Sequence, residues 1–344
     1  MAQSTALWSR VPHGSGLQQW SLGARTFDDD GNESLALTSI DPWTEITFFA
    51  GPSVITNESR AVVLYQRDQQ CRVVELSDGV TRLSQPISIP IAVVGRCDTL
   101  AWTRDGYSFL AWGGDGETRT SVERVTVRAS GNVLRESLPD SFAMSRTQRL
   151  VASATTEDQS IFYLTQELSR SNTTTLSFEA RGATPPTRIE LATTNFTSTG
   201  HLIGTPSGTL AIFTHPDSAT VQWRLIRTDG SVSAPQQFAL PFRENNHSIA
   251  HTEAIRTTDG AMILIAAEGA TDGIAGITLI ALSSDGTTHT APLTLRSRLR
   301  QRSFIGLAAT RAGALVFEEG SNTLPGASSA DTAPTAHATP IFCD

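Results

Sequence analysis

The sequence of 344 residues predicts an all-β fold, a six-bladed β-propeller of four-stranded antiparallel blades whose ring is closed by the N-terminal strands. Three observations predict it. A short strand pattern ending in a turn glycine recurs at intervals of 48 to 56 residues, four strands fit into each interval, and each chain end supplies only half of such a unit. Seven blades are the alternative. No stretch has the periodicity of an amphipathic helix of useful length.

The most regular part of the repeat is an alternating strand followed by a glycine. Four of its six occurrences are Asp-Gly, the dipeptide that supplies positive φ in tight hairpins. Another alternating run follows each turn, as at 87–89 and 293–295. We assign these two runs to the third and fourth strands of a blade. The six glycines are Gly31, Gly79, Gly131, Gly182, Gly230 and Gly286.

The first two strands of each blade precede this element. A polar turn is followed by four or five apolar residues, as at 109–112, 210–213 and 262–265. One more short strand lies upstream of most of these runs, as at 99–102 and 305–308. Strands of this length with turns at this pitch are typical of a sheet-forming repeat.

The chain ends predict how the ring closes. Residues 17–38 supply only a third and a fourth strand, and residues 303–317 only a first and a second. Together they make one blade beside five complete ones, which removes the exposed edges of a linear sheet. Residues 1–319 are therefore the propeller, and the Ala/Ser/Thr/Pro-rich residues 320–344 are expected to form a poorly ordered tail.

The segments AWTRDGYSFLAW (101–112) and RTTDGAMILI (256–265) resemble the strand–Asp-Gly–strand units of bacterial propellers of the TolB-like and WD40-like class. The resemblance implies the fold and carries over no functional residue, because one fold hosts many functions. It also implies that the loops from fourth to first strand and from second to third strand share the face on which ligands gather.

Composition limits the compartment and the partners. All 26 basic residues are arginine, and the net charge of −8 argues against nucleic acid. No apolar run reaches the roughly 18–20 residues of a membrane span, so no membrane insertion is expected. A Thr/Ser/Gly/Ala-rich, lysine-free, acidic chain is typical of exported bacterial β proteins. We expect an extracellular or periplasmic protein whose leader has been removed; a cytoplasmic protein is the alternative.

Three cysteines leave two interpretations open. They are Cys71, Cys97 and Cys343, with no CxxC pair to suggest zinc or redox chemistry. Either one disulfide and one free thiol are present, or all three are thiols. The sequence does not decide the pairing.

Three groups of residues are candidates for ligand binding. Alternate arginines from Arg296 to Arg302 share one face of an extended strand and can bind an anion. Two histidines and a glutamate at 247–253 share a face one blade earlier, as a metal or acid/base cluster would. A tryptophan at a loop offers a stacking surface for a sugar. The chosen residues are Arg298, Arg300, Arg302, His247, His251, Glu253 and Trp43.

These features predict a non-enzymatic binding or scaffold module for a protein or an anionic polymer or glycan, with no catalytic residue and no cofactor. One alternative is a metal-dependent hydrolase or glycan-active enzyme, and another is a sugar-binding lectin that uses Trp43. Lactonase-like six-bladed hydrolases hold calcium with residues from successive blades, and the Asp28–Asp30 turn is a second calcium candidate. The residues considered for such a ring are Glu45, Asp98, Asp140, Asn195 and Glu253.

Overall fold

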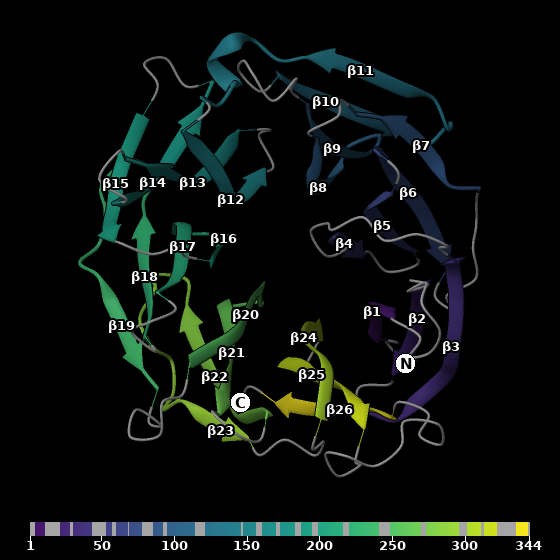
Figure 1. The fold of residues 1–344 in the computed structure, drawn as a ribbon, viewed down its shortest axis with the longest axis vertical. Helices are drawn as coiled ribbons and strands as arrows, with labels where there is room; N and C mark the ends of the chain where they lie inside the picture. Colours follow the sequence, from purple (N-terminus) through teal and green to yellow (C-terminus); the bar gives the residue numbers. More distant parts are fainter. Residues whose placement is uncertain are drawn as a thin grey trace.

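Antiparallel strands, arranged as seven sheets around a common axis, make up the part of the chain that the computed structural model describes (Figure 1). The described residues are 4–10, 21–27, 30–42, 53–56, 60–67, 69–77, 85–91, 95–113, 121–145, 147–155, 160–169, 173–182, 187–194, 199–215, 220–240, 248–269, 273–295, 301–310, 313–321 and 335–342. None of their helices is long and apolar enough to cross a membrane. The all-β propeller fold is confirmed.

Five of the sheets are four-stranded and follow one another along the chain. They are β4 (Ser53–Thr56), β5 (Arg60–Arg67), β6 (Gln70–Ser77) and β7 (Ile87–Pro90); β8 (Arg96–Thr103), β9 (Gly106–Gly113), β10 (Ser121–Arg128) and β11 (Val133–Ser137); β12 (Gln148–Thr155), β13 (Ile161–Leu168), β14 (Thr174–Arg181) and β15 (Thr187–Thr194); β16 (Thr199–Thr205), β17 (Gly208–His215), β18 (Thr220–Ile226) and β19 (Gln236–Ala239); and β20 (Ser248–Arg256), β21 (Gly260–Gly269), β22 (Gly273–Ser283) and β23 (Leu293–Leu295). These are the five complete blades that the repeat predicts.

The two chain ends close the ring, but they do not share one four-stranded sheet as the sequence predicts. They form two adjacent three-stranded sheets, β1 (Ser4–Arg10), β2 (Ser21–Phe27) and β3 (Glu33–Pro42), and β24 (Gln301–Thr310), β25 (Gly313–Ser321) and β26 (Thr335–Phe342). Counted by sheets, the ring therefore has the seven members of the alternative. The two end sheets contact each other through β1 and β24 and through the rings of Phe27 and Phe317, whose centroids lie 5.1 Å apart.

The strand β26 is the reason for this difference. It pairs with β25, the position that the sequence interpretation gives to the N-terminal strands, and it lies within the expected tail. Its Thr- and Ala-rich sequence has little of the apolar alternation that marks the other strands, although Ala338 is buried. Residues 322–334, between β25 and β26, lie outside the described part.

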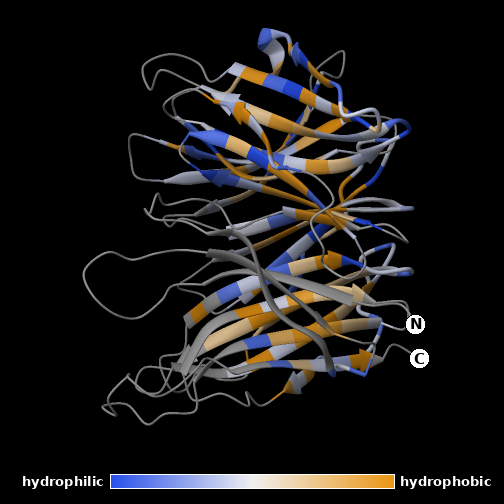
Figure 2. Ribbon diagram, turned by 90° about the vertical axis from the view of Figure 1, so that its right-hand side faces the viewer, coloured by the Kyte–Doolittle hydropathy of each residue, from blue (hydrophilic) through white to orange (hydrophobic). Residues whose placement is uncertain are grey.

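The core lies between neighbouring sheets. Along the strands, hydrophobic residues alternate with hydrophilic ones (Figure 2). One cluster joins β17 and β18 to β21 and β22, and another joins β5 and β6 to β9 and β10. In the latter, a disulfide links Cys71 on β6 to Cys97 on β8, with Cα atoms 5.7 Å apart. It closes a loop across two blades and, by the chain-entropy account, stabilises the fold by about 3–4 kcal/mol. The pairing that the sequence left open is thereby assigned.

The predicted turn glycines have the backbone that the turns require. Five of the six are described and all have φ between +80° and +83°; Gly79 lies outside the described residues. A second series begins the second strand of several blades, and here space is the constraint. A Cβ on Gly208 (φ +142°) would lie 2.2 Å from the carbonyl oxygen of Ile226, and one on Gly106 (φ +155°) 2.0 Å from that of Val127.

Replacement of Gly208 by alanine is expected to lower the free energy of unfolding by about 2–3 kcal/mol. The added methyl group would overlap the Ile226 carbonyl oxygen, and this backbone atom can shift only if the pairing of β17 with β18 is distorted. Gly204, four residues earlier, has ordinary φ, and a methyl group added to it would meet no atom within 4 Å. Its replacement by alanine should leave stability unchanged or raise it slightly. Urea unfolding followed by tryptophan fluorescence compares the two; equal losses would contradict the steric argument.

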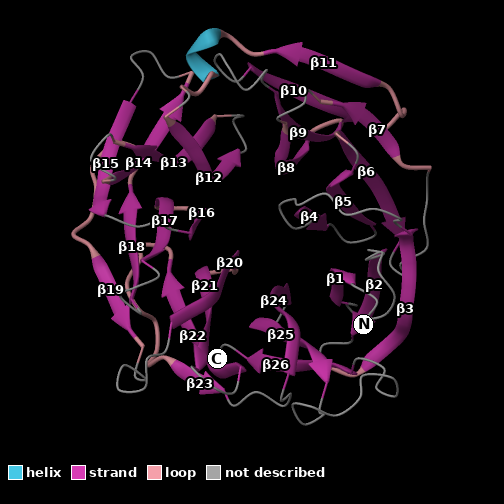
Figure 3. Ribbon diagram, viewed as in Figure 1, coloured by secondary structure: helices cyan, strands magenta, loops and turns pink. Residues whose placement is uncertain are grey.

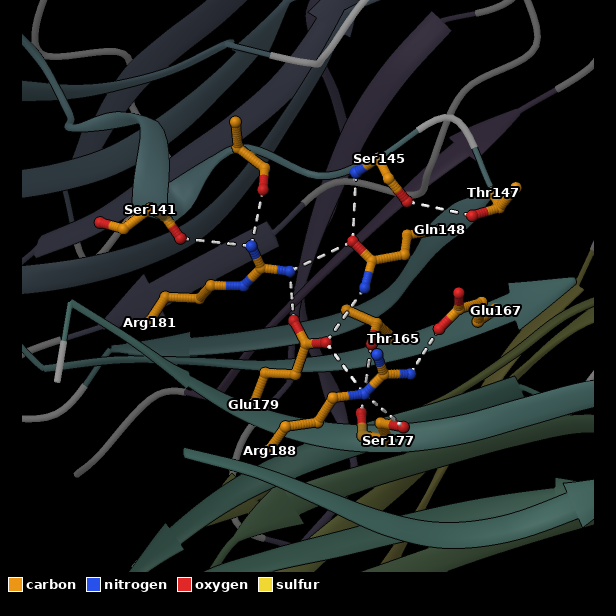
Figure 4. Close-up of polar contacts among 11 residues, drawn as sticks. Ser141, Ser145, Thr147, Gln148, Thr165, Glu167, Ser177, Glu179, Arg181 and Arg188 are labelled. Atoms are coloured by element: carbon orange, nitrogen blue, oxygen red, sulfur yellow. Dashed lines mark hydrogen bonds and ion pairs between the residues drawn. The ribbon is translucent and has the colours of Figure 1, made fainter. Parts of the chain in front are cut away.

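A polar network fastens the connection between β11 and β12 to the sheet of β12–β15 (Figure 4). This connection contains the helical turn η1 (Asp140–Phe142), drawn in cyan in Figure 3. Arg181 donates to the carbonyl oxygens of Ser141 and Ala143, at 3.2 and 2.6 Å, and pairs with Glu179. Its guanidinium also lies 5.5 Å from the centre of the Tyr163 ring. The arginine thus ties three elements together.

Candidate functional site

The strands nearest the axis of the ring have one edge without a strand partner. They are β1, β4, β8, β12, β16, β20 and β24, each the terminal strand of its sheet (Figure 1). Neighbouring members contact each other around the ring. Because buried backbone groups need hydrogen-bond partners, side chains from the adjacent inner strand are expected to reach these edges.

Among the described residues, three such contacts are present, each between residues 51 to 54 positions apart, which is one repeat. Arg96 Nη1 on β8 donates to the Leu150 carbonyl oxygen on β12, at 3.3 Å. His201 Nε2 on β16 lies 3.0 Å from the Thr252 carbonyl oxygen on β20. The Leu307 N–H on β24 donates to Glu253 Oε2 on β20, at 2.7 Å. The last two bring His201, Thr252 and Glu253 to one region of the inner ring.

Glu253 is the carboxylate of this region. Burial among the inner strands raises its pKa to about 7, and the Leu307 N–H opposes this shift only in part. The side chain is nevertheless 32% exposed, so a small molecule can reach it. A carboxylate with a pKa near neutrality has appreciable amounts of both its acid and its base form at pH 7, as a general acid or base requires.

His251 lies two residues earlier on the same strand. Its Nε2 atom is 4.0 Å from Glu253 Oε2, and 45% of its side chain is exposed. Burial lowers the pKa of His251 below its usual value, so the imidazole is neutral at pH 7. The β-bulge between Ile249 and His251 shifts the register of β20 against β21 just before these residues. Such bulges re-aim side chains.

His201 is the deeper of the two histidines. Burial lowers its pKa to about 4, with a smaller contribution from the nearby His251, and the hydrogen bond to Thr252 opposes the shift. A neutral imidazole that is bonded to the backbone of the next blade positions β20. It is a positioning residue for the segment that carries His251 and Glu253.

The spacing between His251 and Glu253 suits a bridging water. At 4.0 Å the two atoms are too far apart for a direct hydrogen bond. A water molecule at about 2.8 Å from each can hydrogen-bond to both. The pair can therefore hold a water between a carboxylate that accepts its proton and a neutral imidazole that orients it.

Of the seven ligand-binding residues predicted, the structure places two together, His251 and Glu253. His247, Arg298, Arg300 and Trp43 lie outside the described residues, and Arg302 lies on β24 with a side chain that the structure does not describe. These five stay predictions. The sequence interpretation missed His201. The repeat length could have pointed to His201, because His201 lies 51 residues, or one repeat, before its partner Thr252 on the next inner strand.

The residues considered for a calcium ring are scattered. Asp98 lies on β8 and pairs with Arg96 at 3.0 Å, whereas Asp140 is exposed in η1. Glu45, Asn195, Asp28 and Asp29 are not among the described residues. Within the described part, no group of three or more His, Cys, Asp and Glu side chains is arranged to hold a metal ion.

Two solved structures show the same architecture over nearly the whole chain. A periplasmic gluconolactonase from Pseudomonas aeruginosa is 13% identical, with a TM-score of 0.53 over 92% of this chain and 91% of that one. A provisionally named 6-phosphogluconolactonase from Bacteroides fragilis is 14% identical, with a TM-score of 0.54 over 93% and 91%. No family model and no curated protein matches the sequence.

These comparisons correct the predicted function. At such identity the likeness establishes the fold, but both proteins are named as lactone hydrolases. The expected non-enzymatic binding or scaffold module is therefore contradicted, and the hydrolase alternative is better supported. The polar pair on β20, which the sequence analysis considered as part of a metal or acid/base cluster, gives that alternative a chemical basis.

Proposed function

We propose that the chain is a hydrolase of small cyclic esters, such as lactones of sugar acids, with its reaction centre at His251 and Glu253 on β20. The observation that carries the proposal is an accessible carboxylate, with a pKa of about 7, that lies 4.0 Å from a neutral imidazole near the axis of the ring. The lactonase names of the two structural neighbours support the choice of substrate.

In the proposed reaction, Glu253 accepts a proton from the bridging water as the water oxygen attacks the lactone carbonyl carbon. The tetrahedral intermediate then collapses, and the bond between the carbonyl carbon and the ring oxygen breaks. The proton on Glu253 passes to the departing ring oxygen. The products are a carboxylic acid and a hydroxyl group on one open chain, so all atoms of lactone and water are accounted for.

His251 orients the water in this scheme, and His201 holds β20 in position through Thr252. Neither needs to be charged, which agrees with the lowered pKa values of both imidazoles. The Leu307 N–H keeps the Glu253 carboxylate on the side of β24, so its direction toward the water is set before substrate binds.

We further propose that the protein works in an oxidising compartment outside the cytoplasm. The bond between Cys71 and Cys97 supports this, because structural disulfides form and persist in exported proteins. The periplasmic location named for one neighbour is consistent with it.

The test of the activity uses the purified chain with glucono-δ-lactone and a series of γ- and δ-lactones at pH 7. Proton release is followed with a pH indicator and compared with the spontaneous rate. We expect hydrolysis above that rate for at least one sugar lactone, with linear acyclic esters as poorer substrates. No acceleration for any lactone in the series would refute the proposal.

A further inference from the structure

A second candidate site lies around the turn between β8 and β9, in a different part of the ring from Glu253. A pocket of about 700 Å³ opens where the sheet of β8–β11 meets the beginning of β5. The turn between β8 and β9 and the residues after β10 form its walls. The lining residues that matter here are Arg60, Trp102, Arg104, Asp105, Arg128 and Ser130. Two sheets separate this part of the ring from the sheet that carries Glu253.

The pocket is cationic in an acidic protein. Three guanidinium groups and one carboxylate line it, although the whole chain has a net charge of −8. Arg60 is compensated by Glu75, at 3.4 Å. Arg104 and Arg128 are exposed, and no side chain in the described ranges forms an ion pair with either. Two like charges at one pocket, neither of them in an ion pair with a described side chain, disfavour each other and favour the binding of an anion.

The turns hold these arginines in a fixed relation. The Ala129 N–H donates to the Asp105 carbonyl oxygen at 2.8 Å, which joins the turn that carries Arg104 to the turn that follows Arg128 at the end of β10. Gly106 packs against the Val127 carbonyl oxygen so closely that no side chain fits there. The backbone segments that present the two arginines are thus held together, which lowers the ordering cost of binding.

An aromatic ring gives the pocket an apolar wall. Trp102 contributes to the lining and is itself held by its neighbours. The Arg60 guanidinium lies 5.9 Å from the centre of its ring, and Tyr107 meets it edge-on at 6.3 Å. A volume of this size accommodates a small molecule of one or two rings.

We propose that this pocket binds a phosphate monoester carried on a ring-bearing small molecule. Guanidinium groups match phosphate oxygens in forked geometry, and a phosphate monoester offers three terminal oxygens and about two negative charges at pH 7. A single arginine can pair with both oxygens of a carboxylate, whereas the three terminal oxygens of a phosphate monoester can accept hydrogen bonds from several arginines at once. The ring of the ligand then lies against Trp102. This inference does not rest on the proposed hydrolase activity.

The test is isothermal titration calorimetry at fixed ionic strength with phenyl phosphate, inorganic phosphate and benzoate as probes. We expect phenyl phosphate to bind more tightly than either of the others. The double variant R104S/R128S should weaken it at least tenfold. The matched control R135S/R227S removes two exposed arginines elsewhere, so that both variants have the same net charge.

The variant W102F tests the ring contact. It should weaken phenyl phosphate while inorganic phosphate is unaffected, and its circular dichroism reports whether the fold is kept. Absence of phenyl phosphate binding, equal weakening in R104S/R128S and R135S/R227S, or benzoate binding as tightly as phenyl phosphate would each overturn the proposal. Because binding is measured without turnover, failure here is distinguishable from failure of the lactonase proposal.

Discussion

Replacement of Glu253 by glutamine is expected to lower kcat/KM for lactone hydrolysis by roughly 10²- to 10⁴-fold, the usual contribution of a general base. Glutamine keeps an oxygen that can accept the Leu307 N–H, so the contact between β20 and β24 survives. The loss would then report the proton-accepting role of the carboxylate and leave the architecture intact. Steady-state rates, corrected for spontaneous hydrolysis, measure it.

The pH profile gives an independent reading of the same group. Only the deprotonated carboxylate accepts a proton, and the pKa of Glu253 is raised to about 7 by burial. The value of kcat/KM should therefore rise as the pH increases through about 7 and level off above it. An ordinary exposed glutamate, with a pKa near 4.3, would give a flat profile over pH 6–9. The variant E253Q should lose this dependence.

The control for both measurements is E136Q, which changes an exposed glutamate on the outer strand β11. It should match the unmodified protein in rate and in pH profile. If E253Q retained full activity and the same profile, the carboxylate would serve only to join β20 to β24. The reaction centre would then have to be sought elsewhere.

The five complete blades could be predicted because their signals are local. A turn glycine at positive φ, such as Gly230, and the alternating strands on each side lie within one repeat. Closure of the ring is a choice between distant partners for β25, and no local signal decides it. The chain pairs β25 with β26, so the N-terminal strands form a sheet of their own.

The same distinction separates the residues that the sequence interpretation found from those it missed. His251 and Glu253 are two positions apart on one strand, and alternation alone puts them on one face. The bond from His201 to Thr252 crosses a blade boundary and appears only when blades stack. The pocket around Arg104 and Arg128 likewise needs two turns that are 24 residues apart to meet.

Replacement of Glu179 by alanine is expected to produce the largest loss of stability, about 3–5 kcal/mol in the free energy of unfolding, because it leaves a buried arginine without its counter-charge. The side chains of Glu179 and Arg181 are 5% and 12% exposed. Gln148 Nε2 donates to Glu179 Oε1 at 3.1 Å, so the substitution also removes a hydrogen-bond acceptor (Figure 4). Urea unfolding followed by tryptophan fluorescence measures the change.

The matched control is Glu123→Ala, which breaks the pair between Glu123 and Arg135 at 2.5 Å on β10 and β11. This pair is solvent-accessible, so its loss should cost at most about 1 kcal/mol. The double variant E179L/R181M separates two explanations of a large loss in E179A. If the cost comes from the uncompensated guanidinium, removal of both charges should recover most of the stability. The other explanation is that Arg181, without Glu179 to hold it, releases the carbonyl oxygens of Ser141 and Ala143 in E179A. The double variant lacks the same two hydrogen bonds, so in that case it should be as unstable as E179A.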